Sequence, residues 1–152
     1  MNSPREAQFN ALLALIGTAQ INSRPAFVTT SRKFVQWEST NDPDLPMAIV
    51  TKGFEFASQN NSRGETRWRV KALLWIYCLH APDSTVPGTQ LNDLLDAVET
   101  VLKPPAWDGA RQTLGGLVDH AYIDGEIIVS EGSLPDDRYS IAVLPITLET
   151  GV

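Results

Sequence analysis

The segment Arg67–Leu79, with the sequence RWRVKALLWIYCL, carries the strongest strand signal in this chain of 152 residues. Its first half alternates strictly, with basic side chains at 67, 69 and 71 and apolar side chains at 68, 70 and 72. Such alternation is typical of a strand with one face in solvent and one in a core. From Leu73 onward the residues are apolar on both faces, which is typical of a strand covered on both sides. The segment therefore predicts a central strand that runs from a half-exposed sheet into full burial.

Two amphipathic helices are expected to cover this strand. Ser3–Glu6 has the pattern of a capping box, with Ser3 as N-cap, Pro4 at the first helical position and Glu6 reaching back. The second helix opens at Pro87 or Thr89 and runs to about Lys103, where Pro104-Pro105 stops it. The apolar stripes of the two helices are Phe9, Leu12, Leu13 and Ile16, and Leu91, Leu94, Leu95, Val98, Val101 and Leu102.

Further strand signals flank the helices. They cover Phe27–Trp37, Met47–Val50 and Phe54–Phe56 (two pieces broken at Gly53), Leu117–Ala121, Ile123–Ser130 with a turn at Asp124-Gly125, and Tyr139–Leu148. Pro145 predicts that the last strand is an edge strand or bulged. The order of elements predicts an α+β fold, a mostly antiparallel β-sheet with two amphipathic helices packed on one face. We expect a single domain over residues 1–152, with an exposed hairpin tip at 58–65 and a loop at 104–112.

The composition sets the class of protein. Hydrophobic residues make up 43% of the chain and charged residues 20%, which favours an ordered globular protein. Cys78 is the single cysteine, so an intrachain disulfide is excluded. No apolar run approaches the roughly 18 residues of a membrane span, and the N-terminus lacks a signal-peptide pattern. We expect a soluble protein of a reducing compartment.

The charge is divided unevenly along the chain. The net charge of −6 argues against a dedicated nucleic-acid binder. Residues 1–80 hold nine Lys and Arg against six Asp and Glu, a net +3, whereas residues 81–152 hold three against twelve, a net −9. Two oppositely charged surfaces would favour head-to-tail self-association. The alternative is that the two halves intermix in the fold and the asymmetry has no consequence.

Catalytic signals are weak throughout the sequence. His80 and His120 lie forty residues apart, with no ligand-type residue at metal spacing beside them. Cys78 sits in the most apolar segment, which favours a buried and inert thiol. Gly115-Gly116 lacks the spacing of a phosphate loop, and there is no G-x-S-x-G elbow. The prediction is a protein that is not an enzyme, with no catalytic, metal or cofactor site.

Residues 87–148 resemble a known family. The carrying segments are Pro87–Ala97 (PGTQLNDLLDA), Gln112–His120 (QTLGGLVDH), Gly125–Ile127, Glu131-Gly132 and Ile141–Thr147 (IAVLPIT). Their order resembles the tail terminator proteins of long, non-contractile bacteriophage tails, also called minor tail or tail completion proteins. The N-terminal helix and the Trp68–Leu79 strand fit the same pattern, whereas residues 24–63 lie outside it.

The resemblance implies a virion protein without enzymatic activity, assembled in the host bacterial cytoplasm. It would form a hexameric ring at the head-proximal end of the tail tube, stop tube polymerisation and dock the head completion protein. Its partners would be itself, the tail tube protein and the neck, with no membrane and no sequence-specific nucleic acid.

A ring needs two complementary surfaces on each subunit. The hypothesis is that basic residues of one copy face acidic residues of a neighbour, with the 104–112 loop as a further contact. The candidate interface residues are Arg63, Arg67, Arg69, Lys71, Asp93, Asp96, Glu99 and Trp107.

Three alternatives remain open. One is a head–tail connector (neck) protein of the same particle. Another is a small nucleic-acid-binding module, because the cations and aromatic of Arg67–Lys71 interleave as in single-strand platforms. The third is an enzyme with a site around His120.

Overall fold

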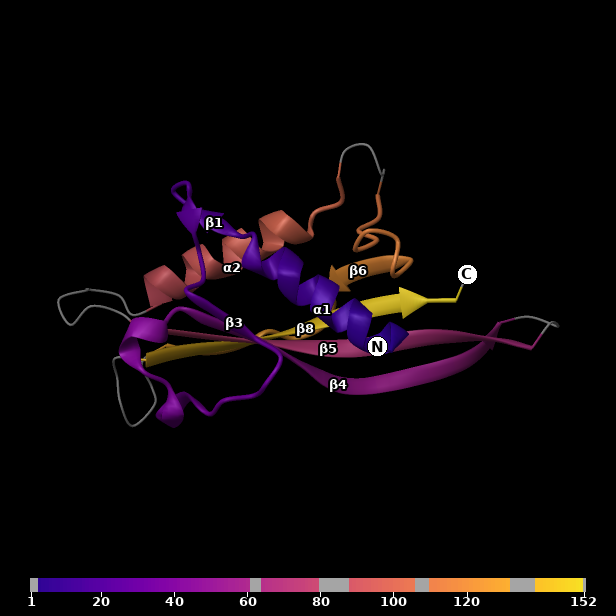
Figure 1. The fold of residues 1–152 in the computed structure, drawn as a ribbon, viewed down its shortest axis with the longest axis horizontal. Helices are drawn as coiled ribbons and strands as arrows, with labels where there is room; N and C mark the ends of the chain where they lie inside the picture. Colours follow the sequence, from indigo (N-terminus) through magenta and orange to yellow (C-terminus); the bar gives the residue numbers. More distant parts are fainter. Residues whose placement is uncertain (1–2, 61–63, 80–87, 106–109, 132–138, 152) are drawn as a thin grey trace.

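The computed structural model describes residues 3–60, 64–79, 88–105, 110–131 and 139–151 (Figure 1). The helices are α1 (Pro4–Gly17), α2 (Gly88–Leu102) and two 3-10 turns, η1 (Trp37–Ser39) and η2 (Asp42–Asp44). The strands are β1 (Gln20–Ile21), β2 (Arg24–Pro25), β3 (Thr29–Ser31), β4 (Met47–Asn60), β5 (Glu65–Leu79), β6 (His120–Ile123), β7 (Ile128–Glu131) and β8 (Tyr139–Thr150). The predicted α+β class is confirmed.

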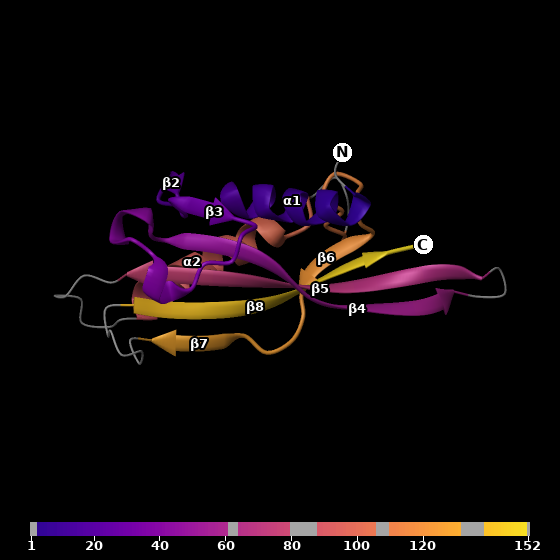
Figure 2. The same ribbon diagram turned by 60° about the horizontal axis from the view of Figure 1, so that its bottom comes forward.

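One long sheet organises the molecule (Figures 1 and 2). Its strand order is β3-β4-β5-β8-β6, and β7 also pairs with β8. Every pairing is antiparallel except that of β3 with β4. The predicted central strand is confirmed, because β5 lies between β4 and β8 along nearly its whole length.

Both helices pack on one face of this sheet, as predicted. The Ser3 hydroxyl accepts a hydrogen bond from the Glu6 amide at the start of α1. The apolar sides of the helices meet alternate residues of β4, β5 and β8. Fully buried side chains of this core include Leu12, Ile16, Val50, Leu74, Ile76, Leu91, Leu94, Val98, Leu144, Ile146 and Leu148.

A second, smaller core lies on the opposite face, beneath the segment 32–46. Its buried members are Leu45, Met47, Ile49, Tyr77 and Tyr139, and the Phe34 ring packs edge-on to Trp75 at 5.0 Å between centroids. Two tyrosine hydroxyls hold the segment down. Tyr77 donates to the Val35 carbonyl at 2.8 Å, and Tyr139 is hydrogen-bonded to Asp42 Oδ1 at 2.6 Å. We call residues 32–46 the strap.

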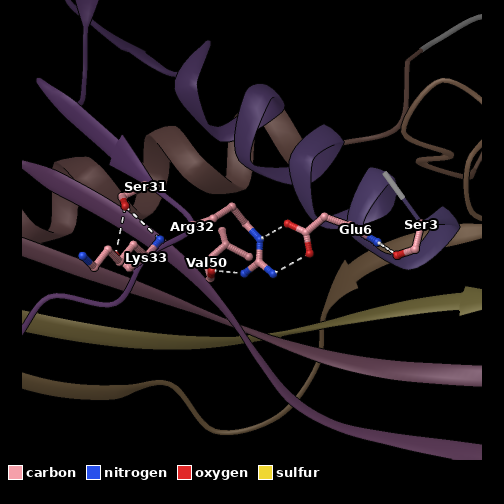
Figure 3. A network of polar contacts seen from close by, with 6 residues as sticks. All are labelled: Ser3, Glu6, Ser31, Arg32, Lys33 and Val50. Atoms are coloured by element: carbon pink, nitrogen blue, oxygen red, sulfur yellow. Dashed lines mark hydrogen bonds and ion pairs between the residues drawn. The ribbon is translucent and has the colours of Figure 1, made fainter. Parts of the chain in front are cut away.

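The strand predicted over Phe27–Trp37 is wrong beyond the three residues of β3. Arg32 leaves the sheet because its guanidinium binds both Glu6 carboxylate oxygens, at 2.9 and 3.0 Å, and donates to the Val50 carbonyl (Figure 3). The predicted return of the Glu6 side chain to its own N-cap is therefore wrong as well. The Glu6 carboxylate instead ties α1 to the chain leaving β3.

The predicted break at Gly53 is also wrong, since β4 continues through a bulge between Lys52 and Phe54. A Cβ at Gly53 would lie 3.1 Å from the Lys71 carbonyl, so the close approach of the two strands favours glycine there. The pairing of β4 with β5 continues to Asn60 and Glu65. The strands thus extend into the predicted 58–65 tip, of which residues 61–63 lie outside the described part.

β8 is an interior strand, so the edge or bulge predicted from Pro145 is wrong. The Pro145 carbonyl accepts from the Asp124 amide at 3.0 Å, so the proline nitrogen points to the same side of the strand. There the neighbouring chain passes from β6 to β7, and no ladder hydrogen bond requires a donor from residue 145.

Two C-terminal strand boundaries also differ from the prediction. Residues 117–119 form a turn, and β6 begins only at His120. The predicted strand over Ile123–Ser130 is divided into β6 and β7, which pair with successive parts of β8. At Asp124-Gly125, where a turn is predicted, the chain bends without reversing its direction, and Gly125 has a φ of +124°.

Candidate functional site

The described part of the chain offers little for catalysis. Within it, no group of three or more His, Cys, Asp and Glu side chains is placed to hold a metal ion. Burial raises the pKa of the Cys78 thiol to about 12. The His120 Nδ1 accepts from the Gln112 amide at 3.1 Å, and its ring packs on Tyr122. His80 lies outside the described residues. No described helix is long and apolar enough to cross a membrane.

An aromatic and basic surface lies on the helix-free side of the β4–β5 hairpin. Phe54 is 50% exposed and Phe56 is 61% exposed, and their rings form an edge-on pair at 5.2 Å between centroids. Phe56 is in register with Arg69, and Arg67 lies two residues before Arg69 on β5. We call Phe54, Phe56, Arg67 and Arg69 the hairpin face.

The bulge in β4 creates this surface. Before the bulge, Ala48 and Val50 pair with Ile76 and Leu74, and all four side chains lie in the helix-side core. After it, Phe54 pairs with Lys71 and Phe56 with Arg69, on the opposite side of the sheet. One extra residue therefore turns the even-numbered side chains of β4 from the core to solvent.

The three basic residues on this side of β5 have different surroundings. Arg69 is largely exposed and pairs with Glu149 at 3.1 Å. The Lys71 ammonium donates to the Asp124 carbonyl and to Thr147 Oγ1, both at 2.8 Å, and only 15% of its side chain is exposed. Among the residues that the structure describes, Arg67 has no ion-pair partner. Arg63 lies outside them.

The predicted acidic residues share the solvent side of α2. Asp93, Asp96 and Glu99 are exposed, whereas Leu91, Leu94 and Val98 of the same helix are buried. None of the three carboxylates forms an ion pair within the described part of the chain. The basic and acidic candidates thus lie on opposite faces of the molecule, and the chain does not bring them together. Trp107 falls outside the described residues.

A third feature, missed by the sequence analysis, is an open apolar cavity of about 480 Å³ between the end of α2 and β6. It is lined by Leu102, Pro104, Ala110, Ala121, Ile123 and Ile127, with Glu99, Lys103, His120 and Tyr122 among its polar residues. Burial and a 3.0 Å hydrogen bond to Glu149 raise the pKa of Tyr122. We call this feature the α2–β6 cavity. No short sequence motif predicts this cavity, because residues from three separate segments line it.

The Gln112–Gly116 block that stands out in the sequence supports the same region. Gln112 is buried, and its amide nitrogen donates to the Lys103 carbonyl at 3.3 Å. Its amide oxygen accepts from the Leu114 amide at 3.3 Å. Residues 114, 115 and 116 all have positive φ, between 51° and 91°, which explains the two glycines. The block is a structural link from α2 to β6.

The sequence matches no family model and no curated protein. Among solved structures, it is similar to a chain of the structure titled "Virion of native gene transfer agent (GTA) particle". That chain is 11% identical, with a TM-score of 0.47, and the alignment covers 93% of this chain and 84% of the other.

Proposed function

We propose that this protein is a structural component of a phage-like virion and acts there as a tail terminator. It assembles as a ring of six copies on the head-proximal end of the tail tube. There it stops polymerisation of the tube and presents the surface on which the head completion protein docks. The proposal draws on the residues 87–148 that resemble terminator proteins, together with the surfaces that the fold presents.

The observation that carries the proposal is the separation of two complementary surfaces on one domain. The hairpin face presents arginines from the helix-free side of the sheet, and α2 presents Asp93, Asp96 and Glu99 from the other layer. Different surfaces on opposite sides give head-to-tail contacts, which close into rings when the rotation between copies allows it.

Ion pairs within the chain neutralise part of the charge difference between the basic half, residues 1–80, and the acidic half, residues 81–152. Arg69–Glu149 and Lys71–Asp124 join the basic and acidic halves within one chain. Arg67 and the three α2 carboxylates lack ion pairs with described residues, so they are the charges that a neighbouring copy would neutralise. Lys71 is already hydrogen-bonded within the chain, which makes it the least suited of the basic candidates.

The test is tail length, measured by negative-stain electron microscopy on particles assembled with and without this protein. Overlong, irregular tubes without heads would support the terminator. Complementation with the intact chain should restore a uniform length, and an empty vector provides the control. Tubes of unchanged length on normal particles would contradict the proposal.

The same experiment separates the runner-up function, a head–tail connector. A connector acts after the tube is complete, so its loss leaves tails of normal length detached from filled heads. Its fold could be the same, since small α+β domains serve unrelated roles. Tail length therefore distinguishes the two functions where the fold does not.

A further inference from the structure

We propose that the Phe54–Phe56 pair of one copy docks into the α2–β6 cavity of a second copy. This inference rests on the proposed ring and names the contact that builds it. Each of the two surfaces is thus the binding partner of the other, because the aromatic pair of one copy fills the cavity of the next.

The aromatic pair has the properties of an interface anchor. Both rings are at least half exposed in the single chain and contact each other edge-on at 5.2 Å. Aromatic residues and arginine are both enriched at protein interfaces relative to the rest of the surface. The bulge in β4 holds the two rings outward on a paired strand, so little conformational freedom is lost when they dock.

The cavity has a matching size and chemistry. Its volume of about 480 Å³ falls within the roughly 300–1,000 Å³ of sites that enclose drug-sized ligands, and two aromatic rings are of that scale. Most of its lining side chains are apolar, and Ile127 beside it is 38% exposed. Water would leave both apolar surfaces when the rings entered.

The placement of the two surfaces requires a second copy. In this part of the sheet the strand order is β4-β5-β8-β6, so β4 and β6 lie at opposite edges (Figure 1). The aromatic pair belongs to β4, and β6 lines the cavity. The pair faces the helix-free side, whereas the cavity lies beside α2. A chain cannot bring its own pair to its own cavity without breaking the sheet, but a neighbour related by rotation can.

Charge favours the same orientation. Arg67 and Arg69 lie beside the aromatic pair, and Glu99 lies at the cavity, with Asp96 one turn earlier on α2. Docking the rings brings the arginines of one copy toward the carboxylates of the next. The opposite polarity, pair against pair, would place four arginines together and is disfavoured.

The test is disulfide trapping between two versions of the full chain, S58C and I127C, which carry tags of different mass. Ser58 lies two residues after Phe56 on the same face of β4, so S58C leaves both rings in place. A disulfide requires Cα atoms within about 7 Å, so it reports direct contact. Cys78 is buried and does not interfere. With copper phenanthroline as oxidant, the mixture should give mainly the mixed dimer, at least several-fold above the homodimers. K103C replaces I127C if that variant fails to fold.

The matched control is V28C, because Val28 is 63% exposed and directly precedes β3, which pairs with the part of β4 before the bulge. A mixture of S58C with V28C should give only background cross-linking. Mixed dimers of S58C and I127C that do not exceed this background would overturn the inference. If native mass spectrometry showed a ring under those conditions, the ring would use another contact and the proposed function would stand. Normal tail length in particles assembled without the protein would instead contradict the proposed terminator function.

Discussion

The two halves of the β4–β5 ladder are made by the same two strands but differ in what covers them. In the half around Ile49 and Tyr77, the helices lie on one face and the strap on the other. In the half around Phe56 and Arg69, the helix-free face is open. A single bulge and the reach of the strap separate a region built for stability from one available for binding.

The largest expected effect is in the covered half. Leu74 is fully buried in the helix-side core, so Leu74→Ala should lower the free energy of unfolding by about 2–5 kcal/mol. Urea denaturation followed by circular dichroism measures this. Leu74→Met is the control and should cost less than about 1.5 kcal/mol because it conserves volume. Equal losses for both variants would show that the site does not have the packing of a core.

The next effect concerns Arg32, which joins α1 to the sheet. Arg32→Ala removes the bidentate pair with Glu6, the bond to the Val50 carbonyl and the contact over the Phe9 ring. We expect a loss of about 2 kcal/mol, mostly from the carbonyl left without its charged donor. Glu6→Gln keeps that bond and should cost under about 1 kcal/mol. If the two variants lost the same stability, the Val50 contact would contribute nothing.

The sequence predicts a helix or strand correctly where its local pattern agrees with its tertiary environment. The apolar spacing of α2 and the Ser3 cap of α1 are local signals, and both predictions are confirmed. β5 could be predicted because its alternating half indicates a strand buried on one face and its apolar half indicates a strand buried on both. These elements could be placed without knowing their partners.

Long-range contacts decided the rest. Arg32 leaves the predicted strand for a carboxylate 26 residues earlier, and no local pattern encodes that choice. The bulge reverses the facing of Phe54 and Phe56 relative to Ala48, so simple alternation along β4 assigns them to the core. Of the candidate interface residues, Lys71 was expected to face a neighbour, yet it binds Asp124 and Thr147 from distant segments.

A smaller effect is expected from pH, at the contacts that join α1 to the sheet. The hydrogen bond from Arg32 lowers the pKa of Glu6, and Lys52, followed by Arg5, lowers that of Glu55. Their stabilisation is complete above pH 4.5, the ordinary pKa of the group, and is lost as pH falls through the lowered values.

Urea midpoints at pH 6 and pH 3 measure this loss, and the doubly substituted E6Q/E55Q chain is the control. That variant should start lower at pH 6 and fall less on acidification. If the urea midpoint of the variant fell as much as that of the native chain, other carboxylates would be responsible for the acid sensitivity.

The smallest expected effect on stability is in the open half of the β4–β5 ladder. Phe56→Ser removes a ring that is 61% exposed, so the free energy of unfolding of the single chain should change by less than about 0.5 kcal/mol. Urea denaturation at a concentration where the chain is monomeric measures this, beside Leu74→Ala from the other half. A loss above about 1 kcal/mol would show that the open half also supports the fold. A negligible loss means that a large aromatic side chain is held in solvent without stabilising the domain that carries it, which is expected of a residue whose packing partner belongs to another molecule.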